Sequence, residues 1–342
     1  MKALFLDEDR RLSLRETETP VIHAGEVLIK VMRAGICATD LGYVRFGSPK
    51  LSLPVILGHE ASGVIEAVGE GVSELAPGQR VITMNDYYTC GKCRYCERGD
   101  VNMCLKRRSL GSKENGVFAE YVKVPARIVL PLDEAISFEE GALIEPFACG
   151  VHALAGQACL KPGDVVFISG PGAIGAGATL YAKAAGCTVA VSGLPVDRPR
   201  LEVLRALGID HTLIAGEDPV EETILALTDG YGADVSVEAA GAYRSLETCL
   251  SLTRRKGTVV QLGILHGQPA DLSPLIYKEL FLHASYSKTV ADWRRALSLV
   301  KSGKVNLKPL VSQIFPLEEY EAAFEKAAAG SGFKILFDPE QP

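Results

Sequence analysis

The amino-acid sequence predicts an α/β protein of two domains, and three observations carry that prediction. The chain has 342 residues, more than one compact core usually covers. Its first 150 residues are glycine-punctuated and carry short β-branched runs, which is typical of a β-rich domain. From about residue 160, short apolar runs alternate with helix-patterned segments. Such alternation indicates a doubly wound parallel sheet with helices on both faces.

The β-branched runs of the first region lie between turn signals, at 27–31, 63–68 and 119–124. In the second region, short apolar runs predict strands at 165–168, 188–191, 211–214, 235–238, 258–261 and 281–284. Helical periodicity falls between them, most clearly at 201–207 and 243–250. From about residue 290 the chain no longer alternates strands and helices in this way. This tail predicts helices at 292–300 and about 317–329, and a closing strand at 333–337 that returns to the first domain.

Charge and hydropathy argue against two classes of function. The net charge of −6 provides no electrostatic footprint for nucleic acid, and no window approaches the roughly 18 consecutive apolar residues of a membrane span. The amino terminus turns acidic at Asp7, Glu8 and Asp9, which is too early for a signal peptide. We therefore expect a cytoplasmic protein with reduced thiols, and neither nucleic acid nor membrane as a partner.

Four cysteines stand close together in the sequence: Cys90, Cys93, Cys96 and Cys104. This spacing lets one loop bring four sulfurs to within about 2.3 Å of one Zn²⁺ ion. The surrounding residues are polar and glycine-punctuated, so the lobe has little core of its own and needs a cross-link. Disulfides and an iron–sulfur cluster are the alternatives, because cysteines recur at short spacings in both. Zinc is the preferred interpretation, and a closed four-cysteine site is structural.

A glycine-rich turn follows the first strand of the second region. It reads Gly-Pro-Gly-Ala-Ile-Gly, and its predicted cofactor-binding residues are Gly170, Gly172, Ala173, Ile174 and Gly175. Between a strand and a helix, such glycines make a tight turn and let the backbone approach a pyrophosphate at the helix N-terminus. A purely structural tight turn is the alternative. Gly263, just after the predicted strand 258–261, is also expected to contact the cofactor.

The identity of the dinucleotide stays open. An acidic residue commonly ends the second strand and holds the ribose 2′-hydroxyl of NAD, but Ser192 and Gly193 occupy that place here. Arg198 or Arg200 could meet the 2′-phosphate of NADP, whereas Asp197 could fold back onto an NAD ribose. We expect NAD or NADP, bound in part by Ser192, Gly193 and Arg198.

An ordered set of motifs along the whole chain resembles the medium-chain zinc-dependent alcohol and polyol dehydrogenases. The set comprises Cys37-Ala38-Thr39-Asp40, Gly58-His59-Glu60, the four-cysteine lobe, 116–121, Glu145-Pro146, the glycine-rich turn and Ser302-Gly303. The resemblance implies a catalytic domain, 1–148 with 285–342, built as a chaperonin-10-like β-barrel. It also implies a Rossmann dinucleotide-binding domain, 149–284, inserted between these two segments.

The resemblance further implies a second, catalytic zinc. Its ligands map onto Cys37, His59 and the acidic pair Glu60 and Glu145. Where alcohol dehydrogenase has a second cysteine ligand, this chain has Glu145, which is similar to the sorbitol and threonine dehydrogenase branch. Glu60 is expected to bind the metal directly, to act through water or to orient His59. The structural alternative is a carboxylate paired with a nearby arginine.

By the same resemblance, Thr39 is the hydroxyl that first accepts the alcohol proton, and Asp40 stands behind the metal ligands. Relatives often carry a histidine at the position of Gly42 to pass the proton on. Because this histidine is absent, the proton is expected to pass through water or the cofactor ribose, or to be transferred more slowly. Three aromatic residues are expected either to line the substrate pocket or to pack in the core: Tyr43, Phe46 and Phe118.

Together these features predict reversible, zinc-dependent oxidation of a secondary alcohol, in a polyol or sugar-derived substrate, by hydride transfer to NAD(P). About two zinc ions per chain are expected. The alternatives are a threonine-type amino-alcohol dehydrogenase, a simple alcohol dehydrogenase, and a non-enzymatic NADP(H)-binding protein without catalytic zinc. Family members are dimers or tetramers assembled partly through the sheet edge at 281–285, so we expect a homodimer or homotetramer.

Overall fold

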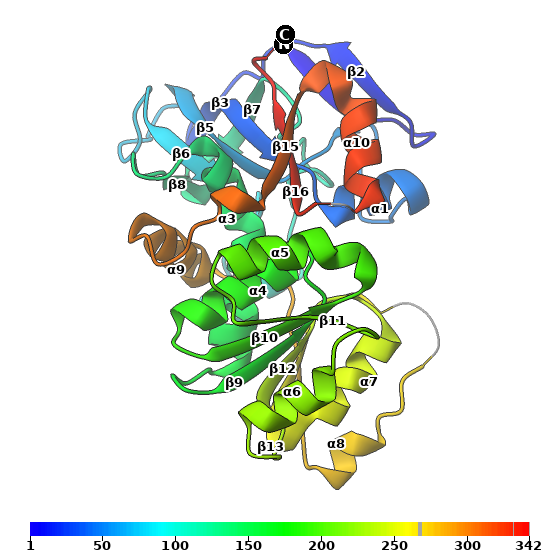
Figure 1. Ribbon diagram of the computed structural model, residues 1–342. Coiled ribbons are helices and arrows are strands. Elements are labelled where there is room, and N and C mark those ends of the chain that lie inside the picture. The colour runs from blue at the N-terminus through cyan, green and yellow to red at the C-terminus, as the bar shows by residue number, and fades with distance from the viewer. Residues whose placement is uncertain (266–268, 331, 342) are drawn as a thin grey trace. The chain divides into compact units, whose positions relative to one another are not determined.

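The computed structural model describes residues 1–265, 269–330 and 332–341, and the chain divides into two compact units (Figure 1). The first unit comprises Met1–Glu145 and Leu307–Pro342, and the second comprises Pro146–Asn306. Strands dominate the first unit, whereas strands and helices alternate in the second. The α/β class predicted from the sequence is therefore confirmed.

The first unit is built on a large sheet in the order β15-β16-β3-β5-β6-β8, with β7 also paired to β3. Its strands are β3 (Glu26–Gly35), β5 (Glu60–Val68), β6 (Arg80–Thr83), β7 (Tyr121–Pro125), β8 (Val129–Pro131), β15 (Val311–Pro316) and β16 (Lys334–Asp338). A smaller sheet has the order β2-β1-β4, from β1 (Lys2–Leu6), β2 (Leu12–Glu16) and β4 (Val55–Ile56). Register shifts between β3 and β5 add twist to the large sheet, as a barrel requires.

The predicted closing strand is confirmed as β16, which pairs antiparallel with β3 and parallel with β15. The helix predicted before it is α10 (Tyr320–Ala329), preceded by the short turn Leu317–Glu319. Phe324 of α10 and Phe337 of β16 surround the ring of Phe118, with ring centroids 6.2 and 5.1 Å away. The tail therefore completes both the sheet and the aromatic core of the first unit.

The second unit contains a parallel sheet in the order β11-β10-β9-β12-β13-β14. Its strands are β9 (Val165–Ser169), β10 (Thr188–Gly193), β11 (His211–Ile214), β12 (Ala233–Glu238), β13 (Thr253–Gln261) and β14 (Phe281–Ala284). The helices between them are α4 (Ala173–Ala184), α5 (Arg198–Ala206), α6 (Val220–Leu227), α7 (Tyr243–Leu252) and α8 (Ser273–Tyr277). Helices α4 and α5 cover one face and α6 and α7 the other (Figure 1), which confirms the doubly wound prediction.

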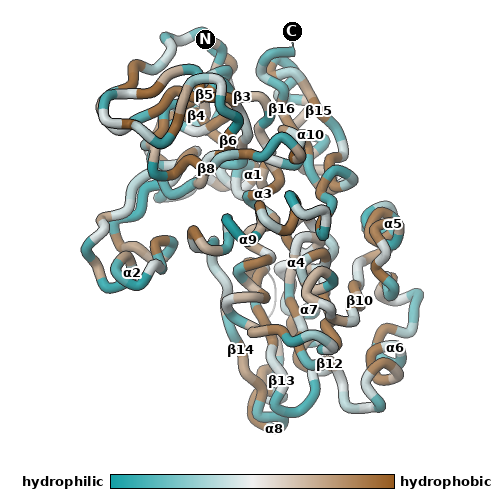
Figure 2. The backbone as a smooth tube through the Cα atoms, turned by 90° about the vertical axis from the view of Figure 1, so that its left-hand side faces the viewer, coloured by the Kyte–Doolittle hydropathy of each residue, from teal (hydrophilic) through white to brown (hydrophobic). Residues whose placement is uncertain are grey.

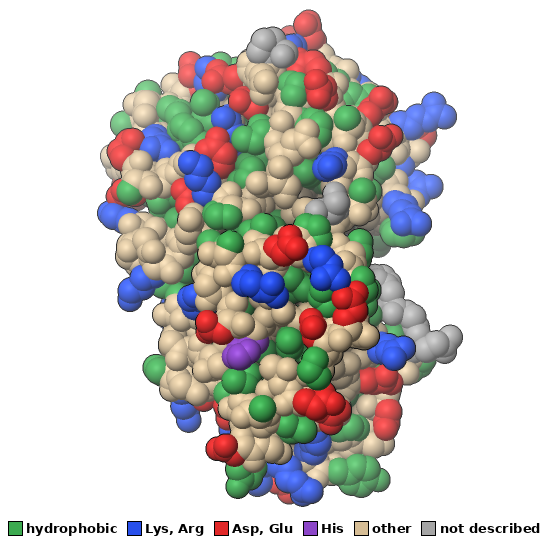
Figure 3. Space-filling view, in the orientation of Figure 1, with side chains coloured by type: hydrophobic (Ala, Val, Ile, Leu, Met, Phe, Trp, Pro, Cys, Tyr) green, Lys and Arg blue, Asp and Glu red, His purple; other side chains and the backbone are tan. Residues whose placement is uncertain are grey.

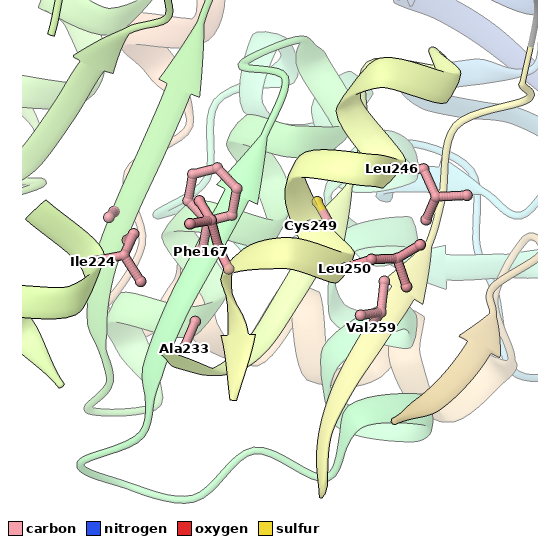
Figure 4. Packing of buried hydrophobic residues seen from close by; sticks show 9 residues of the cluster. Phe167, Ile224, Ala233, Leu246, Cys249, Leu250 and Val259 are labelled. Atoms are coloured by element: carbon pink, nitrogen blue, oxygen red, sulfur yellow. The ribbon is translucent and has the colours of Figure 1, made fainter. Parts of the chain in front are cut away.

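A cluster of buried apolar side chains joins this sheet to α6 and α7 (Figure 4). Phe167 of β9, Ile224 of α6 and Cys249 of α7 are all fully buried in it. Burial also raises the pKa of the Cys249 thiol well above its usual value, so this cysteine stays neutral and packs as a small apolar residue. Burying Phe167 alone contributes about 1.5–3 kcal/mol.

The chain passes from the second unit back to the first later than predicted. Residues 285–306 were expected in the first domain, but they lie in the second. Helix α9 (Val290–Lys301) is the reason, because its Asp292 forms a 2.8 Å hydrogen bond with Nδ1 of His152, and Trp293 is buried beside it. The first crossing lies between Glu145 and Pro146, within helix α3 (Phe138–Val151), close to the predicted boundary at 148.

Charged side chains are spread over the molecular surface. Basic and acidic residues are interspersed on the face shown in Figure 3. None of the helices in the described part of the chain is both long and apolar enough to cross a membrane.

Candidate metal centres and cofactor site

The four-cysteine lobe is held on two short helical turns, α2 (Arg94–Glu97) and Val101–Met103. It is drawn mostly in hydrophilic colours beside the label α2 in Figure 2. The Sγ atom of Cys96 lies 3.6 Å from that of Cys93 and 4.0 Å from that of Cys90. Four sulfurs around one zinc ion lie about 3.8 Å apart when each is about 2.3 Å from the metal. These separations fit a metal cage and exclude sulfur–sulfur bonds.

The four thiols differ in how readily each loses its proton. Backbone N–H donation, chiefly from Cys96, lowers the pKa of Cys93 to about 6. Desolvation and the neighbouring sulfurs raise the pKa of Cys96 to about 12. Four thiolates this close repel one another unless a positive ion lies among them. The donor set therefore fits Zn²⁺, held by Cys90, Cys93, Cys96 and Cys104.

A second cluster brings together Cys37, His59 and Glu60, whose potential ligand atoms all lie within 4.8 Å of one another. The β3–β5 ladder explains this meeting, because Gly35 at the end of β3 pairs with Glu60 at the start of β5. A Cβ atom on Gly35 would collide with Oε2 of Glu60, so only glycine leaves room for this carboxylate. Cys37 then turns the chain into helix α1 (Ala38–Phe46).

Asp40 stands behind this cluster, as predicted. Its Oδ2 accepts a 2.9 Å hydrogen bond from the backbone N–H of Cys37, and its Oδ1 lies 3.6 Å from Nδ1 of His59. Burial alone would lower the pKa of His59, but the charges of Asp40 and Cys37 hold it well above its usual value. Asp40 thereby fixes the positions of two ligand residues at once.

The partner of Glu60 is a lysine rather than the arginine considered above. Nζ of the buried Lys334, from β16, donates to Glu60 Oε1 at 2.8 Å and to the backbone oxygen of Ile36 at 3.1 Å. Glu60 Oε2 and Asp40 Oδ1 are buried and lack hydrogen-bond partners among the described residues. Such orphaned acceptors beside a thiol and an imidazole fit a zinc ion held by Cys37, His59 and Glu60.

Glu145 does not join this group of donor atoms. It lies on α3, is buried, and its Oε1 accepts a 2.9 Å hydrogen bond from Nδ2 of Asn85. The structure thus separates the predicted acidic pair: Glu60 lies among the ligand atoms, and Glu145 is paired with an amide. Asn85 was missed in the sequence because a lone asparagine before the lobe carries no motif.

The predicted pocket residues lie in three different environments. Phe118 is fully buried beneath Gly58, where a Cβ atom would lie 2.5 Å from its ring, so it packs the core and does not face solvent. Phe46 is 72% exposed, under the guanidinium of Arg45. Tyr43 is half-buried on α1, and Thr39 is exposed on its first turn. Of these four predicted site residues, Thr39 and Phe46 are thus exposed, Tyr43 is half-buried and Phe118 is buried.

The glycine-rich turn has the shape that a pyrophosphate needs. Gly170 has a φ of 106°, and a Cβ on Gly175 would collide with the oxygen of Gly170. A Cβ on Gly172, in contrast, would meet nothing within 4 Å among the described residues, so this backbone is open to a ligand. Ala173 and Ile174 begin α4, whose first N–H groups face an anion placed there.

Side chains of the loop after β10 bind one another. Ser192 is buried at the end of the strand, and a Cβ on Gly193 would press on the loop at Asp197. Both carboxylate oxygens of Asp197 are engaged, one by the backbone N–H of Leu194 at 3.0 Å and one by Arg200 at 2.7 Å. Arg198 forms an exposed pair with Glu217 at 2.6 Å.

A second loop near these glycines is organised by Glu238, which the sequence did not single out. This buried carboxylate accepts the backbone N–H groups of Ala240 and Gly241 at 2.9 and 2.8 Å. A Cβ on Gly170 would lie 2.6 Å from the nitrogen of Ala240, so the two loops touch through glycine. Gly263 has the same role, since a Cβ there would collide with Gly241.

Family models match both units of the chain, and curated relatives match nearly its full length. The family model "Alcohol dehydrogenase GroES-like domain" matches residues 23–134, and "Zinc-binding dehydrogenase" matches residues 173–302. A sorbitol dehydrogenase of Halalkalibacterium halodurans is 37% identical over 99% of both chains. A D-arabitol-phosphate dehydrogenase of Enterococcus avium is 32% identical over 97% of this chain and 95% of its own.

A solved structure leads to the same family. A zinc-binding dehydrogenase of Sinorhizobium meliloti, bound to NADP, matches with a TM-score of 0.91 and 30% identity over 99% of each chain. The first family model matches residues of the first unit, and the second matches residues of the doubly wound second unit. The chain therefore belongs to the medium-chain zinc-dependent alcohol and polyol dehydrogenases.

Proposed function

We propose that this NAD(P)-dependent dehydrogenase interconverts a secondary alcohol and its ketone, in a polyol or sugar-derived substrate. The observation that carries the proposal is the donor set Cys37, His59 and Glu60, with a further carboxylate, Glu145, in the same unit. An oxygen ligand leaves more positive charge on zinc than a thiolate does, which favours a substrate that chelates through two hydroxyls. The sorbitol and arabitol-phosphate dehydrogenase relatives act on such molecules by name.

The side chains around the cluster serve this reaction in distinct ways. When bound there, zinc polarises the alcohol and lowers its pKa, while NAD(P) accepts the hydride. Asp40 orients His59 and the backbone of Cys37, and Lys334 orients Glu60. Thr39 is exposed, so its hydroxyl can take the alcohol proton and pass it to water. The open space beside Gly42 leaves room for that water.

A substrate panel tests the proposal. Sugar alcohols, inositols, threonine, simple secondary alcohols and primary alcohols are assayed with both NAD and NADP. The highest kcat/KM is expected on a sugar alcohol. A preference for threonine would establish an amino-alcohol dehydrogenase. A preference for primary alcohols would establish a simple alcohol dehydrogenase. Turnover of none of them by the zinc-loaded protein would support the non-enzymatic alternative.

The loop after β10 is proposed to select NADP through Arg198. Because Asp197 is engaged on both oxygens, it has less capacity left for a ribose hydroxyl. We expect Arg198→Ala to raise KM for NADP by about tenfold, as loss of a charge-assisted hydrogen bond does, and KM for NAD by less than about twofold. Removing its partner through Glu217→Ala should lower KM for NADP. Equal effects of Arg198→Ala on both cofactors would refute a phosphate-reading role.

The edge of the parallel sheet is proposed to join two copies of the chain, in a homodimer or a tetramer of such dimers. Strand β14 pairs with β13 on one side, and Phe281 and Leu282 are 57% and 42% exposed. Exposed apolar strands at a sheet edge favour pairing with another chain. Leu282→Lys places a charge on this edge and should split a dimer into monomers. The molar mass measured by light scattering should then fall by half. The control Leu105→Lys alters an exposed leucine of the lobe and should leave the mass unchanged.

We also propose that the protein works in a reducing compartment such as the cytoplasm. All nine cysteines are unbridged, and Cys159 is exposed. Exposed thiols and thiolate metal cages persist where glutathione and thioredoxin keep cysteine reduced.

A further inference from the structure

Asn85 is a buried side chain whose hydrogen bonding is half complete. It lies two residues after the end of β6, is 7% exposed, and donates from Nδ2 to Glu145 Oε1 at 2.9 Å. Its carbonyl oxygen, Oδ1, is buried and has no hydrogen-bond partner in the part of the chain that the structure describes. Leaving such a buried acceptor unfilled is destabilising, so its position calls for a donor.

The chemistry of Glu145 fixes which way the Asn85 amide faces. The oxygen Oε1 of Glu145 accepts the hydrogen bond from the NH₂ group of the amide, so the amide oxygen lies on the other side. Oδ1 therefore points away from Glu145 and is offered to another group as an acceptor. The main chain holds the residue in place as well, because its backbone oxygen accepts hydrogen bonds from Tyr87 and Leu110 at 3.1 Å each.

Strand register places Asn85 at the end of the sheet that carries the metal ligands. Ser62 of β5 pairs with Ile82 of β6, and the two strands run antiparallel. His59 precedes Ser62 by three residues, and Asn85 follows Ile82 by three residues. Both residues therefore leave these two strands at the same end. Glu145 lies near that end too, because it accepts a hydrogen bond from Asn85.

We propose that Asn85 is a specificity-determining residue, whose Oδ1 accepts a hydrogen bond from a substrate hydroxyl next to the one being oxidised. The inference rests on the proposed function and deepens it by naming a 1,2-diol unit as what the site selects. A substrate with a single hydroxyl leaves Oδ1 unfilled. A site built around a buried polar group rejects substrates that lack its partner much more strongly than an apolar pocket does.

A pair of probes that differ in one hydroxyl tests this assignment: butane-2,3-diol and 2-butanol. The wild-type enzyme, loaded with zinc, should show the higher kcat/KM on the diol. Asn85→Leu should reduce kcat/KM on the diol by about 10- to 100-fold, the range of a lost buried hydrogen bond, and on 2-butanol by less than about threefold. Equal losses on both probes would overturn the proposal, because they would show a merely structural role.

Two further variants keep the test decisive. Asn85→Asp preserves an acceptor, so it should keep the preference for the diol even if the new carboxylate beside Glu145 lowers both rates. If Asn85→Leu does not fold, loss of the diol preference in Asn85→Asp would still refute the proposal. Asn102→Leu makes the same change at a buried asparagine in the lobe and should leave the ratio of the two rates unchanged.

The wild-type rates separate failure of this inference from failure of the proposed function. If the wild-type enzyme oxidises 2-butanol and neither the diol nor any sugar alcohol, the polyol function itself is wrong, and the role of Asn85 with it. If it prefers polyols and the preference survives in Asn85→Leu, the function stands and only the assignment of Asn85 falls.

Discussion

Replacing Cys37 by serine should lower turnover on every alcohol substrate by at least about a thousandfold, since metal-assisted polarisation supplies several kcal/mol of the lowered barrier. A serine hydroxyl is a much poorer ligand for zinc than a thiolate, so the catalytic site should lose its metal. Metal analysis should show a fall from about two to about one zinc ion per chain. Binding of the cofactor, measured by nucleotide fluorescence, should change by less than about twofold, because its glycine turn lies in the second unit.

Cys187→Ser is the matched control for this variant. Burial, helped by Asp164 and Asp234, raises the pKa of Cys187 to about 11, so it remains a neutral thiol, and it belongs to neither cluster of metal-binding side chains among the described residues. Its zinc content and turnover should therefore match the wild type. Turnover retained in Cys37→Ser would eliminate the catalytic-zinc assignment, whatever the zinc content.

Lys334→Met should destabilise the metal-free first unit by about 3–5 kcal/mol, because it leaves a buried carboxylate without its cation. Lys334 is 4% exposed and Glu60 is fully buried. In the zinc-loaded protein the loss should be clearly smaller, since the metal then provides the positive charge that Glu60 lacks. Chemical denaturation of the metal-free and zinc-loaded forms, followed by a probe of the first unit, measures both values.

Two companion variants separate this effect from lost packing. The double variant Lys334→Met/Glu60→Gln removes both charges and should recover part of the stability of the metal-free form. Lys256→Met breaks the exposed pair with Glu279 and should change stability by less than about 1 kcal/mol. Equal losses in the metal-free and zinc-loaded forms of Lys334→Met would show that Glu60 does not face the metal.

The parts of the fold that could be predicted from the sequence are those specified by local patterns. The turn from Gly170 to Gly175 needs only a strand before it and a helix after it, and both are present. The four cysteines of the lobe lie in one short segment, so their spacing alone indicates a common metal ion. The strands of the parallel sheet could also be predicted, because each is a short apolar run between segments with helical periodicity.

The parts that could not be predicted depend on contacts between distant residues. Lys334 lies 274 residues from Glu60 in the sequence, and no motif connects a lysine in a closing strand with a carboxylate near the start of the chain. Asn85 and Glu145 meet only because β6 and α3 converge. The late crossing at Asn306 likewise depends on the bond between Asp292 and His152, two residues with no shared pattern.

The pairing of β16 with β3 has a consequence for the order in which the protein matures on the ribosome. The second unit is one continuous segment, Pro146–Asn306, so it can fold as soon as it has emerged. The barrel, in contrast, waits with an unpaired strand edge until its last strand arrives, and Lys334 arrives with it. Cys37 and His59 are therefore synthesised early, but their site is complete only after β16 and Lys334 have been synthesised. We expect the newly made chain to acquire its lobe zinc first and its catalytic zinc last.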